Sequence, residues 1–210
     1  MKLCYVTDRN ALAGTADEQI RFLLQKITDA GSSGVDWIQI REKDLSGRAL
    51  TELVREAIRS VPETCRVLVN ERLDVAWTTG AAGVHLGGQS LPVAEAKRFV
   101  REQQITRDFL VGASSHSLEA AQAAEDAGAD YVFFGPIYAT PSKAAFGEPQ
   151  GVERLAGVCR RLRIPVIAIG GITAKNAHEC TEAGASGIAA IRLFQEVGDT
   201  KSLMRDLLAG

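Results

Sequence analysis

Two basic side chains and an amide alternate in the segment Gln39-Ile40-Arg41-Glu42-Lys43. In an extended strand, alternate side chains point to the same face, so Gln39, Arg41 and Lys43 share one side. A guanidinium binds phosphate oxygens with a planar fork, and an ammonium adds a compact positive charge. The pattern predicts a diphosphate grip; the simpler alternative is a set of solvated charges at an exposed strand end.

A second polar segment, Asn70-Glu71-Arg72, offers an amide and a carboxylate. These groups suit a substrate ring or a hard metal ion, which prefers oxygen ligands. The equal alternative is that the acidic residue favours the start of a helix. His85 lies within an apolar run, so we expect a core histidine with satisfied hydrogen bonds. The glycines Gly87-Gly88 follow it and would let the backbone come close to a ligand.

Hydroxyl groups gather in two later segments. Ser114-Ser115-His116-Ser117 either binds a ligand or caps the helix that follows. The segment from Gly135 to about Gln150 carries Thr140, Ser142 and Lys143. A long loop with these side chains predicts a lid that contacts phosphate.

Two further segments, Gly170-Gly171 and Ile191-Arg192, have the features of a phosphate cup. Backbone N–H groups and a helix N-terminus bind phosphate after the last two strands of many barrels. Gly171 would let such amides approach an anion, and Arg192 adds charge. The cations Arg41, Lys43, Lys143 and Arg192 contrast with a formal net charge of −2. The contrast predicts a locally bound, doubly phosphorylated substrate set.

Eight short apolar or β-branched runs alternate with helical patterns along the chain. The runs predict strands at Leu3–Thr7, Trp37–Arg41, Val67–Asn70, Gly83–Leu86, Leu110–Ala113, Tyr131–Phe134, Val166–Ile169 and Gly187–Ile191. Continuously apolar runs are typical of parallel strands buried on both faces. Helical periodicity covers Asp17–Ala30 and Ser46–Ser60, with Ser46 as N-cap, and further helices begin at Pro92 and Ser117.

One turn recurs four times, as AGSSGVDW (30–37), TGAAGVHL (79–86), AGADYVFF (127–134) and AGASGIAA (183–190). Each copy has Gly where a helix should end and a strand directly after it. The repeat predicts a single (β/α)8-barrel domain, residues 1–210, built from four similar quarters. A doubly wound open sheet is the alternative, but no G-x-G-x-x-G follows the first strand.

Composition limits the classes of partner. With 46% hydrophobic residues the chain can bury a full core, and its near-neutral charge gives no general attraction to nucleic acid or anionic membranes. No apolar stretch is long enough for a signal peptide or membrane span, so we expect a cytoplasmic protein. Its isolated cysteines, Cys4, Cys65, Cys159 and Cys180, are then expected to be reduced. Self-association is left open.

Over essentially its whole length the chain resembles thiamine phosphate synthase and its relative, the thiazole tautomerase. The shared segments are YVTD (5–8), QIREK (39–43), NERLDVA (70–76), GVHLG (83–87), SSHS (114–117), ADYVFFGPIYATPSK (129–143) and PVIAIGGIT (165–173). The resemblance implies a transferase that joins 4-amino-2-methyl-5-hydroxymethylpyrimidine diphosphate to hydroxyethylthiazole phosphate. Pyrophosphate leaves first, and a pyrimidine-stabilised carbocation is then attacked by the thiazole nitrogen.

The resemblance also implies roles for individual residues. The pyrimidine diphosphate would contact Gln39, Arg41, Lys43, Asn70, Ser114 and Lys143. The thiazole phosphate would contact Thr140, Ser142, Gly171 and the backbone of Ile191 and Arg192. Catalysis would be carried by Arg41, Lys43 and Lys143 together with Mg²⁺, because the main task is to stabilise charge on the departing pyrophosphate.

The sequence departs from the synthase pattern at the expected metal ligands. The family holds Mg²⁺ with two aspartates, and Glu71 and Ser90 stand at those positions here. Glutamate can still ligate, whereas serine is a poor substitute for a carboxylate. A weaker site, or a metal held mostly by diphosphate and water, is implied. In addition, Ser142 replaces a usual Thr and Arg192 a usual Ser.

Two alternative functions stay open. A tautomerase-like isomerase, acting without metal, would need a general acid–base, for which His116 or Glu71 are the candidates. The tautomerase branch generally lacks the lysine of QIREK and has His after the glycine that corresponds to Gly135. The presence of Lys43 and Pro136 here therefore favours the synthase. The other alternative is a non-catalytic thiamine-phosphate-binding barrel, which the missing carboxylate at Ser90 motivates.

Overall fold

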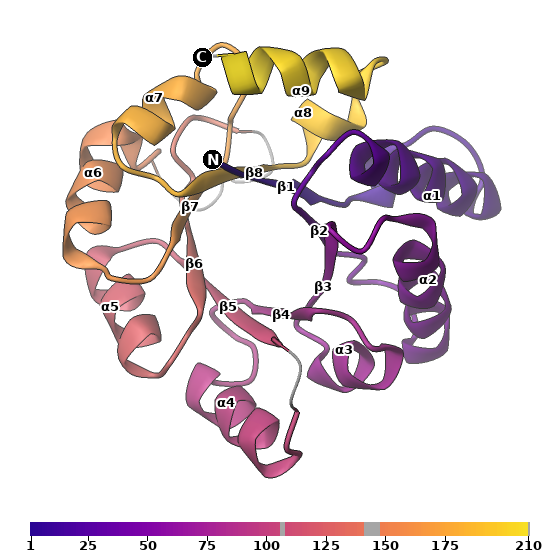
Figure 1. The fold of residues 1–210 in the computed structure, drawn as a ribbon, viewed down its shortest axis with the longest axis horizontal. Coiled ribbons are helices and arrows are strands. Elements are labelled where there is room, and N and C mark those ends of the chain that lie inside the picture. Colours follow the sequence, from indigo (N-terminus) through magenta and orange to yellow (C-terminus); the bar gives the residue numbers. More distant parts are fainter. Residues whose placement is uncertain (106–107, 141–147, 210) are drawn as a thin grey trace.

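Eight parallel strands close into a barrel, and helices surround it (Figure 1). The structure is a computed structural model that describes residues 1–105, 108–140 and 148–209. The strands follow one another around the barrel in chain order, and the last strand pairs in parallel with the first. The predicted (β/α)8 architecture is therefore confirmed, and the open sheet is excluded.

The strands are β1 (Lys2–Val6), β2 (Trp37–Ile40), β3 (Arg66–Asn70), β4 (Gly83–Leu86), β5 (Leu110–Ser115), β6 (Tyr131–Phe134), β7 (Val166–Ile169) and β8 (Gly187–Ala190). All eight predicted strands are present, with small differences at their ends. Arg41 and Ile191 lie just beyond β2 and β8 rather than inside them, whereas Ser114 lies within β5.

The helices are η1 (Arg9–Ala11), α1 (Ala16–Ser32), α2 (Gly47–Ser60), α3 (Leu73–Thr79), α4 (Val93–Glu102), α5 (Leu118–Asp126), α6 (Gly151–Arg161), α7 (Ala177–Glu182), α8 (Arg192–Gln195) and α9 (Thr200–Ala209). Side-chain oxygens cap several of them, as predicted for Ser46, which accepts from Ala49 N. Ser117 accepts from Ala120 N at the start of α5, so its role is that of a cap. No helix in the described ranges combines the length and apolar character needed to cross a membrane.

The fourfold turn that the sequence predicts is present at each of its four positions. Gly34, Gly80, Gly128 and Gly184 all have positive φ, between 80° and 97°. In each copy the next residue donates its backbone N–H to a carbonyl five residues earlier, as Val35 N does to Ala30 O. This is the Schellman arrangement, in which a left-handed glycine ends a helix. It delivers the chain into β2, β4, β6 and β8.

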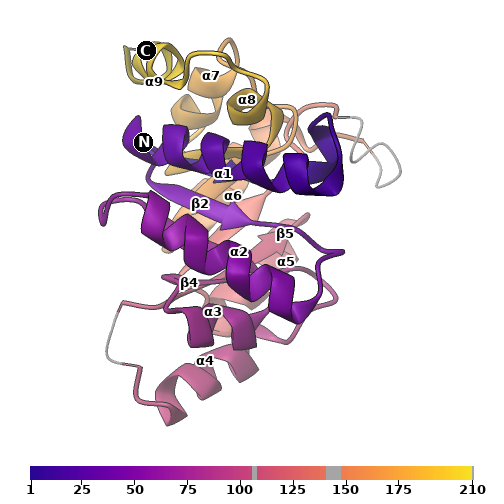
Figure 2. The same cartoon turned by 90° about the vertical axis from the view of Figure 1, so that its right-hand side faces the viewer.

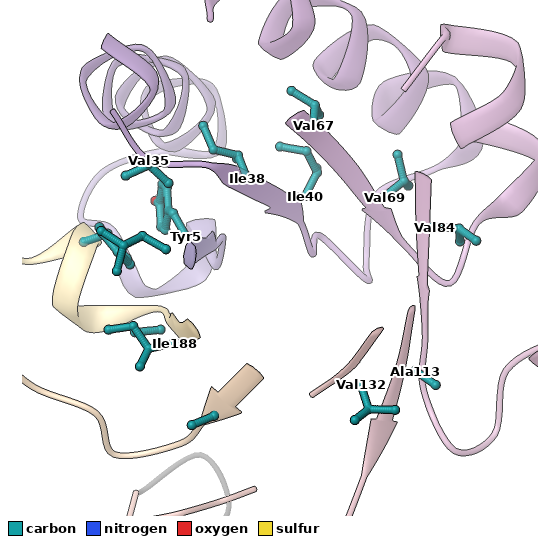
Figure 3. Close-up of a cluster of buried hydrophobic side chains, with 14 of the residues drawn as sticks. Tyr5, Val35, Ile38, Ile40, Val67, Val69, Val84, Ala113, Val132 and Ile188 are labelled. Carbon is teal, nitrogen blue, oxygen red and sulfur yellow. The ribbon is translucent and has the colours of Figure 1, made fainter. Parts of the chain in front are cut away.

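Two apolar layers stabilise the barrel because alternate strand side chains face opposite ways. The outer layer lies between strands and helices, and Figure 3 shows Ile38, Val67, Val69 and Val84 among its side chains. Figure 2 shows α1, α2 and α3 side by side against this face. The inner layer fills the barrel with Cys4, Val6, Trp37, Leu68, Tyr131, Phe133, Ile167 and Ala189. Polar side chains just above this inner layer therefore lie at the carboxyl ends of the strands.

The packing of Tyr131 in the inner layer requires a glycine at position 112. A Cβ at Gly112 would lie 2.0 Å from Tyr131 Cζ, whereas one at Gly157, inside α6, would meet nothing within 4 Å. We expect Gly112→Ala to lower the free energy of unfolding by at least about 1–3 kcal/mol through overpacking. The control Gly157→Ala should raise it by about 0.5–1 kcal/mol, since alanine suits a helix better. Urea unfolding measures both, and equal effects would contradict the steric argument.

Candidate active site

The amide of Gln39 lies inside the barrel near the end of β2. It is buried, and its Nε2 donates to Asn70 Oδ1 of β3 at 2.8 Å. Its Oε1 is also buried and has no hydrogen-bond partner among the described residues. Leaving a buried carbonyl oxygen unpaired is costly, so this atom is suited to accept a hydrogen bond from a ligand. The Gln39 side chain therefore points into the barrel.

The two basic residues of this segment follow directly after β2. Arg41 is half-buried, and its backbone N–H donates to Thr7 Oγ1 at 2.9 Å. Within the described ranges, no residue pairs with its guanidinium. Lys43 is exposed, with Nζ 3.6 Å from Glu71 Oε1. Such an exposed pair stabilises the fold little, so the lysine is available to an anionic ligand.

Glu71 has a left-handed backbone, with φ of 63°, which is uncommon for a residue other than glycine. Its N–H donates to His85 O at 2.8 Å, which ties this conformation to β4. A Cβ built on Gly87 would lie 2.6 Å from Glu71 Oε1 and 3.3 Å from Ser90 Oγ. The fold therefore brings Glu71 and Ser90 together around Gly87, and the carboxylate faces this point rather than capping α3.

The residues around Gly87 are compatible with a hydrated Mg²⁺. They supply one carboxylate and one hydroxyl, and Mg²⁺ commonly uses one or two carboxylates with water and substrate phosphates as its other ligands. Within the described ranges, no three His, Cys, Asp or Glu side chains converge as a metal cage. Glu71 also lines a pocket of about 100 Å³, together with Lys43 and Asn70. An ion held here would need further oxygen ligands from water or from a bound phosphate.

Ser114 on β5 joins a buried hydrogen-bonded chain. Its Oγ lies 2.9 Å from His85 Nε2, and His85 Nδ1 lies 3.1 Å from Tyr131 Oη. Both ring nitrogens of His85 are thus satisfied, as predicted for a core histidine. Because desolvation disfavours the charged form, burial lowers the pKa of His85 to about 3. Ser114 is therefore backed by a neutral imidazole.

The proposed phosphate cup lies where β6, β7 and β8 end. Arg192, the first residue of α8, donates from Nη2 to Thr140 Oγ1 at 3.3 Å, so two predicted phosphate ligands are neighbours. Gly171 has a φ of 68°, and a Cβ on it would lie 2.7 Å from Ala139 O. Close packing against the β6 loop is thus a further reason for this glycine. The backbone amides of Gly171 and Ile191 donate to no other described residue.

Part of the predicted site lies outside the described residues, namely Ser142 and Lys143. His116, a candidate acid–base for the isomerase alternative, is exposed, and its Nδ1 bonds to Gly135 O. A wider hollow of about 440 Å³ lies away from the strand ends, between α2 and α3. Its lining mixes charges of both signs, including Arg48 and Glu52.

A buried ionic network that the sequence did not reveal lies next to the predicted diphosphate grip. Glu42 accepts from Thr7 Oγ1 at 2.6 Å and from Arg9 Nη1 at 3.1 Å, and its side chain is 1% exposed. Arg9 also forms a bidentate pair with Asp44, which lowers the pKa of Asp44 to about 2. Thr7 Oγ1 in turn accepts from Arg41 N. The only sequence signal was alternation, which sends Glu42 to the face opposite Arg41 and Lys43.

A second missed contact holds α8 against β1. Gln195 is buried; its Oε1 accepts from Tyr5 Oη at 3.0 Å, and its Nε2 donates to Asp8 O at 2.6 Å. These bonds join residues about 190 positions apart in the chain. They place the helix that carries Arg192 beside the end of β1.

Comparison with known proteins places the chain among thiamine-forming enzymes. A family model described as thiamine monophosphate synthase matches residues 3–194. A putative thiamine-phosphate synthase of Geobacter sulfurreducens is 41% identical over 209 residues, which span 99% of this chain and 92% of that protein. A thiamine-phosphate synthase of Methanoculleus marisnigri is 43% identical over 180 residues, 85% of this chain and 82% of that protein. The solved thiamine phosphate pyrophosphorylase from Pyrococcus furiosus has a TM-score of 0.83 at 31% identity, covering 99% of this chain and 94% of that one.

Proposed function

Because the chain belongs to the thiamine monophosphate synthase family, we propose that it joins the pyrimidine diphosphate to the thiazole phosphate at the carboxyl end of its barrel. The products are thiamine phosphate and pyrophosphate. The observation that carries this proposal is the buried Gln39–Asn70 pair, with its unpaired acceptor, next to Arg41 and Lys43. The reaction takes place in the cytoplasm, as expected for a biosynthetic enzyme with four free cysteines.

The pyrimidine ring binds beside Gln39, whose buried Oε1 needs a hydrogen-bond donor. Its 4-amino group donates to Gln39 Oε1, the buried oxygen that has no partner among the described residues. Asn70 uses its Oδ1 to accept from Gln39, which leaves its Nδ2 as a donor for the ligand. This pair orients the ring so that its diphosphate lies toward Arg41 and Lys43.

Bond breaking needs no protein nucleophile. The bond between the pyrimidine methylene carbon and the diphosphate oxygen breaks, and its electron pair leaves with pyrophosphate. Arg41 and Lys43 stabilise the growing negative charge, together with Lys143. The thiazole nitrogen then donates its lone pair to the carbocation and forms the new C–N bond. The thiazole phosphate is held by Thr140, Ser142, the Gly171 amide and the backbone of Ile191 and Arg192.

Glu71 and Ser90 are the residues that would hold Mg²⁺ near Gly87. When bound, the ion supplies Lewis-acid stabilisation of the leaving pyrophosphate. Glu71 would contribute the charged ligand, and its ion pair with Lys43 keeps an ammonium close to the position that the ion would take. The chain itself thus supplies positive charge to the leaving group with Arg41 and Lys43, which follow β2, and Glu71 and Ser90 would add the charge of the ion.

The direct test supplies both substrates and Mg²⁺ and measures pyrophosphate release. We expect turnover that requires both substrates. Folded protein that gives no pyrophosphate with ample Mg²⁺ would contradict the proposal. Metal-independent isomerisation of the thiazole carboxylate phosphate would indicate the tautomerase-like activity instead, and binding of thiamine phosphate without either reaction would indicate a non-catalytic barrel.

The second metal position gives a gain-of-function prediction. Replacing Ser90 by aspartate adds a carboxylate beside Glu71, so the Mg²⁺ concentration for half-maximal activity should fall about tenfold. Ser90 Oγ accepts from Gly87 N at 2.8 Å, and an aspartate oxygen can take over that bond. The control Gln89→Asp adds the same charge at an exposed neighbour. An equal response of both variants would show a general charge effect and exclude ligation at position 90.

A further inference from the structure

His85 joins residues of two other strands inside the barrel. Its Nδ1 lies 3.1 Å from Tyr131 Oη on β6, and its Nε2 lies 2.9 Å from Ser114 Oγ on β5. His85 is 2% exposed and Tyr131 is fully buried. The Phe133 ring packs against the imidazole, with the ring centroids 4.2 Å apart. The ring position is therefore set by packing, and the location of its proton decides the direction of both hydrogen bonds.

Only two proton arrangements are consistent with a neutral imidazole. If Nδ1 carries the proton, it donates to Tyr131 Oη, and the phenol proton is left without an acceptor among the described residues. A buried donor without a partner bears its full desolvation cost. If Nε2 carries the proton, Tyr131 donates to Nδ1 and Nε2 donates to Ser114 Oγ. Every buried proton then has an acceptor, so the second arrangement is favoured.

We propose that His85 is a positioning residue that commits Ser114 to donate its hydroxyl proton to a ligand at the strand ends. Ser114 Oγ already accepts from Nε2, so its own proton is free for an acceptor atom of the ligand. Ser114 is only partly buried, and the described residues offer that proton no acceptor. The identity of the ligand as the pyrimidine diphosphate rests on the proposed function.

As a consequence, the β2 side of the site accepts a hydrogen bond from the ligand, and the β5 side donates one to it. Gln39 Oε1 can only accept, while Ser114 is held as a donor. The matching ligand presents an N–H donor to β2 and a lone pair to β5. A ring nitrogen or a phosphate oxygen supplies that lone pair. Tyr131, which is fully buried, sets this preference from two hydrogen bonds away.

The proton location can be measured without any turnover. In protein labelled with ¹⁵N at histidine, NMR shifts of the two ring nitrogens report which one carries the proton. We expect His85 to carry it on Nε2. A proton on Nδ1 would overturn the proposal, and this result does not depend on whether the chain is a synthase. Absence of pyrophosphate release would instead contradict the proposed function alone.

The link to binding is tested by Tyr131→Phe, which removes only the phenol that holds Nδ1 as an acceptor. We expect the KM for the pyrimidine diphosphate to rise roughly tenfold, the cost of one misdirected hydrogen bond, and the KM for the thiazole phosphate to stay unchanged. The effect should disappear in a Ser114→Ala background, because His85 acts through that hydroxyl. If inorganic pyrophosphate binds more weakly as well, the acceptor is a phosphate oxygen; if not, it is a ring atom.

Tyr5→Phe is the matched control. It removes another buried tyrosine hydroxyl, which donates to Gln195 instead. This variant should lose stability and keep the KM for the pyrimidine diphosphate. An unchanged KM in Tyr131→Phe, or an equal rise in Tyr5→Phe, would overturn the positioning role.

Discussion

Replacing Arg41 by alanine is expected to lower kcat/KM for pyrophosphate release by about 10²–10³-fold. The guanidinium follows β2 directly, is half-buried, and has no ion-pair partner in the described part of the chain. Its charge is therefore available to the diphosphate, whose negative charge grows as the C–O bond breaks. Because this stabilisation is greatest in the transition state, the loss should appear mainly in kcat. Steady-state assays with both substrates measure it.

The control for this variant is Arg48→Ala, which removes the same charge from the outer surface of α2. This variant should leave kcat and KM unchanged. Arg41→Lys should recover only part of the activity, since an ammonium lacks the planar fork. Wild-type kinetics in Arg41→Ala would refute the diphosphate grip while leaving the fold intact.

Replacing Glu42 by alanine should lower the free energy of unfolding by about 3–5 kcal/mol, as expected when one partner of a buried ion pair is removed. The change creates a cavity beside the buried Arg9 and removes the carboxylate that accepts hydrogen bonds from Arg9 Nη1 and Thr7 Oγ1. Urea unfolding measures the loss. Glu56→Gln, on the exposed face of α2, is the control and should stay within about 0.5 kcal/mol of wild type.

Glu42→Ala should also affect catalysis through Arg41. Thr7 Oγ1 accepts from Arg41 N while donating to Glu42, so loss of the carboxylate frees the backbone of the diphosphate grip. We expect a raised KM for the pyrimidine diphosphate at temperatures where the variant is still folded. A variant that loses stability but keeps this KM would show that the network supports the barrel and not the grip.

The architecture was accessible from sequence because its signals are local. A continuous apolar run specifies a strand that is buried on both faces, and a positive φ is a property of one residue, so Gly34 and Gly128 mark helix ends without knowledge of the fold. Strand alternation likewise predicts one side for Gln39 and Arg41 from the local sequence alone. The family followed from motifs distributed over the whole chain, and the comparisons confirm it.

The arrangement of the site was decided by tertiary structure, because its partners are distant in sequence. Glu42 meets Thr7 across 35 residues, and His85 meets Tyr131 across 46. Alternation sends Glu42 to the face opposite Arg41, but the local pattern does not show that this carboxylate is buried. It also does not distinguish Gly112 from any other strand glycine. The pairing of β1 with β2 brings Glu42 to Thr7, and the pairing of β5 with β6 places the Tyr131 ring over Gly112. Residue type and periodicity thus determined the fold and the chemical groups available, whereas the direction of each buried hydrogen bond depends on which strands become neighbours.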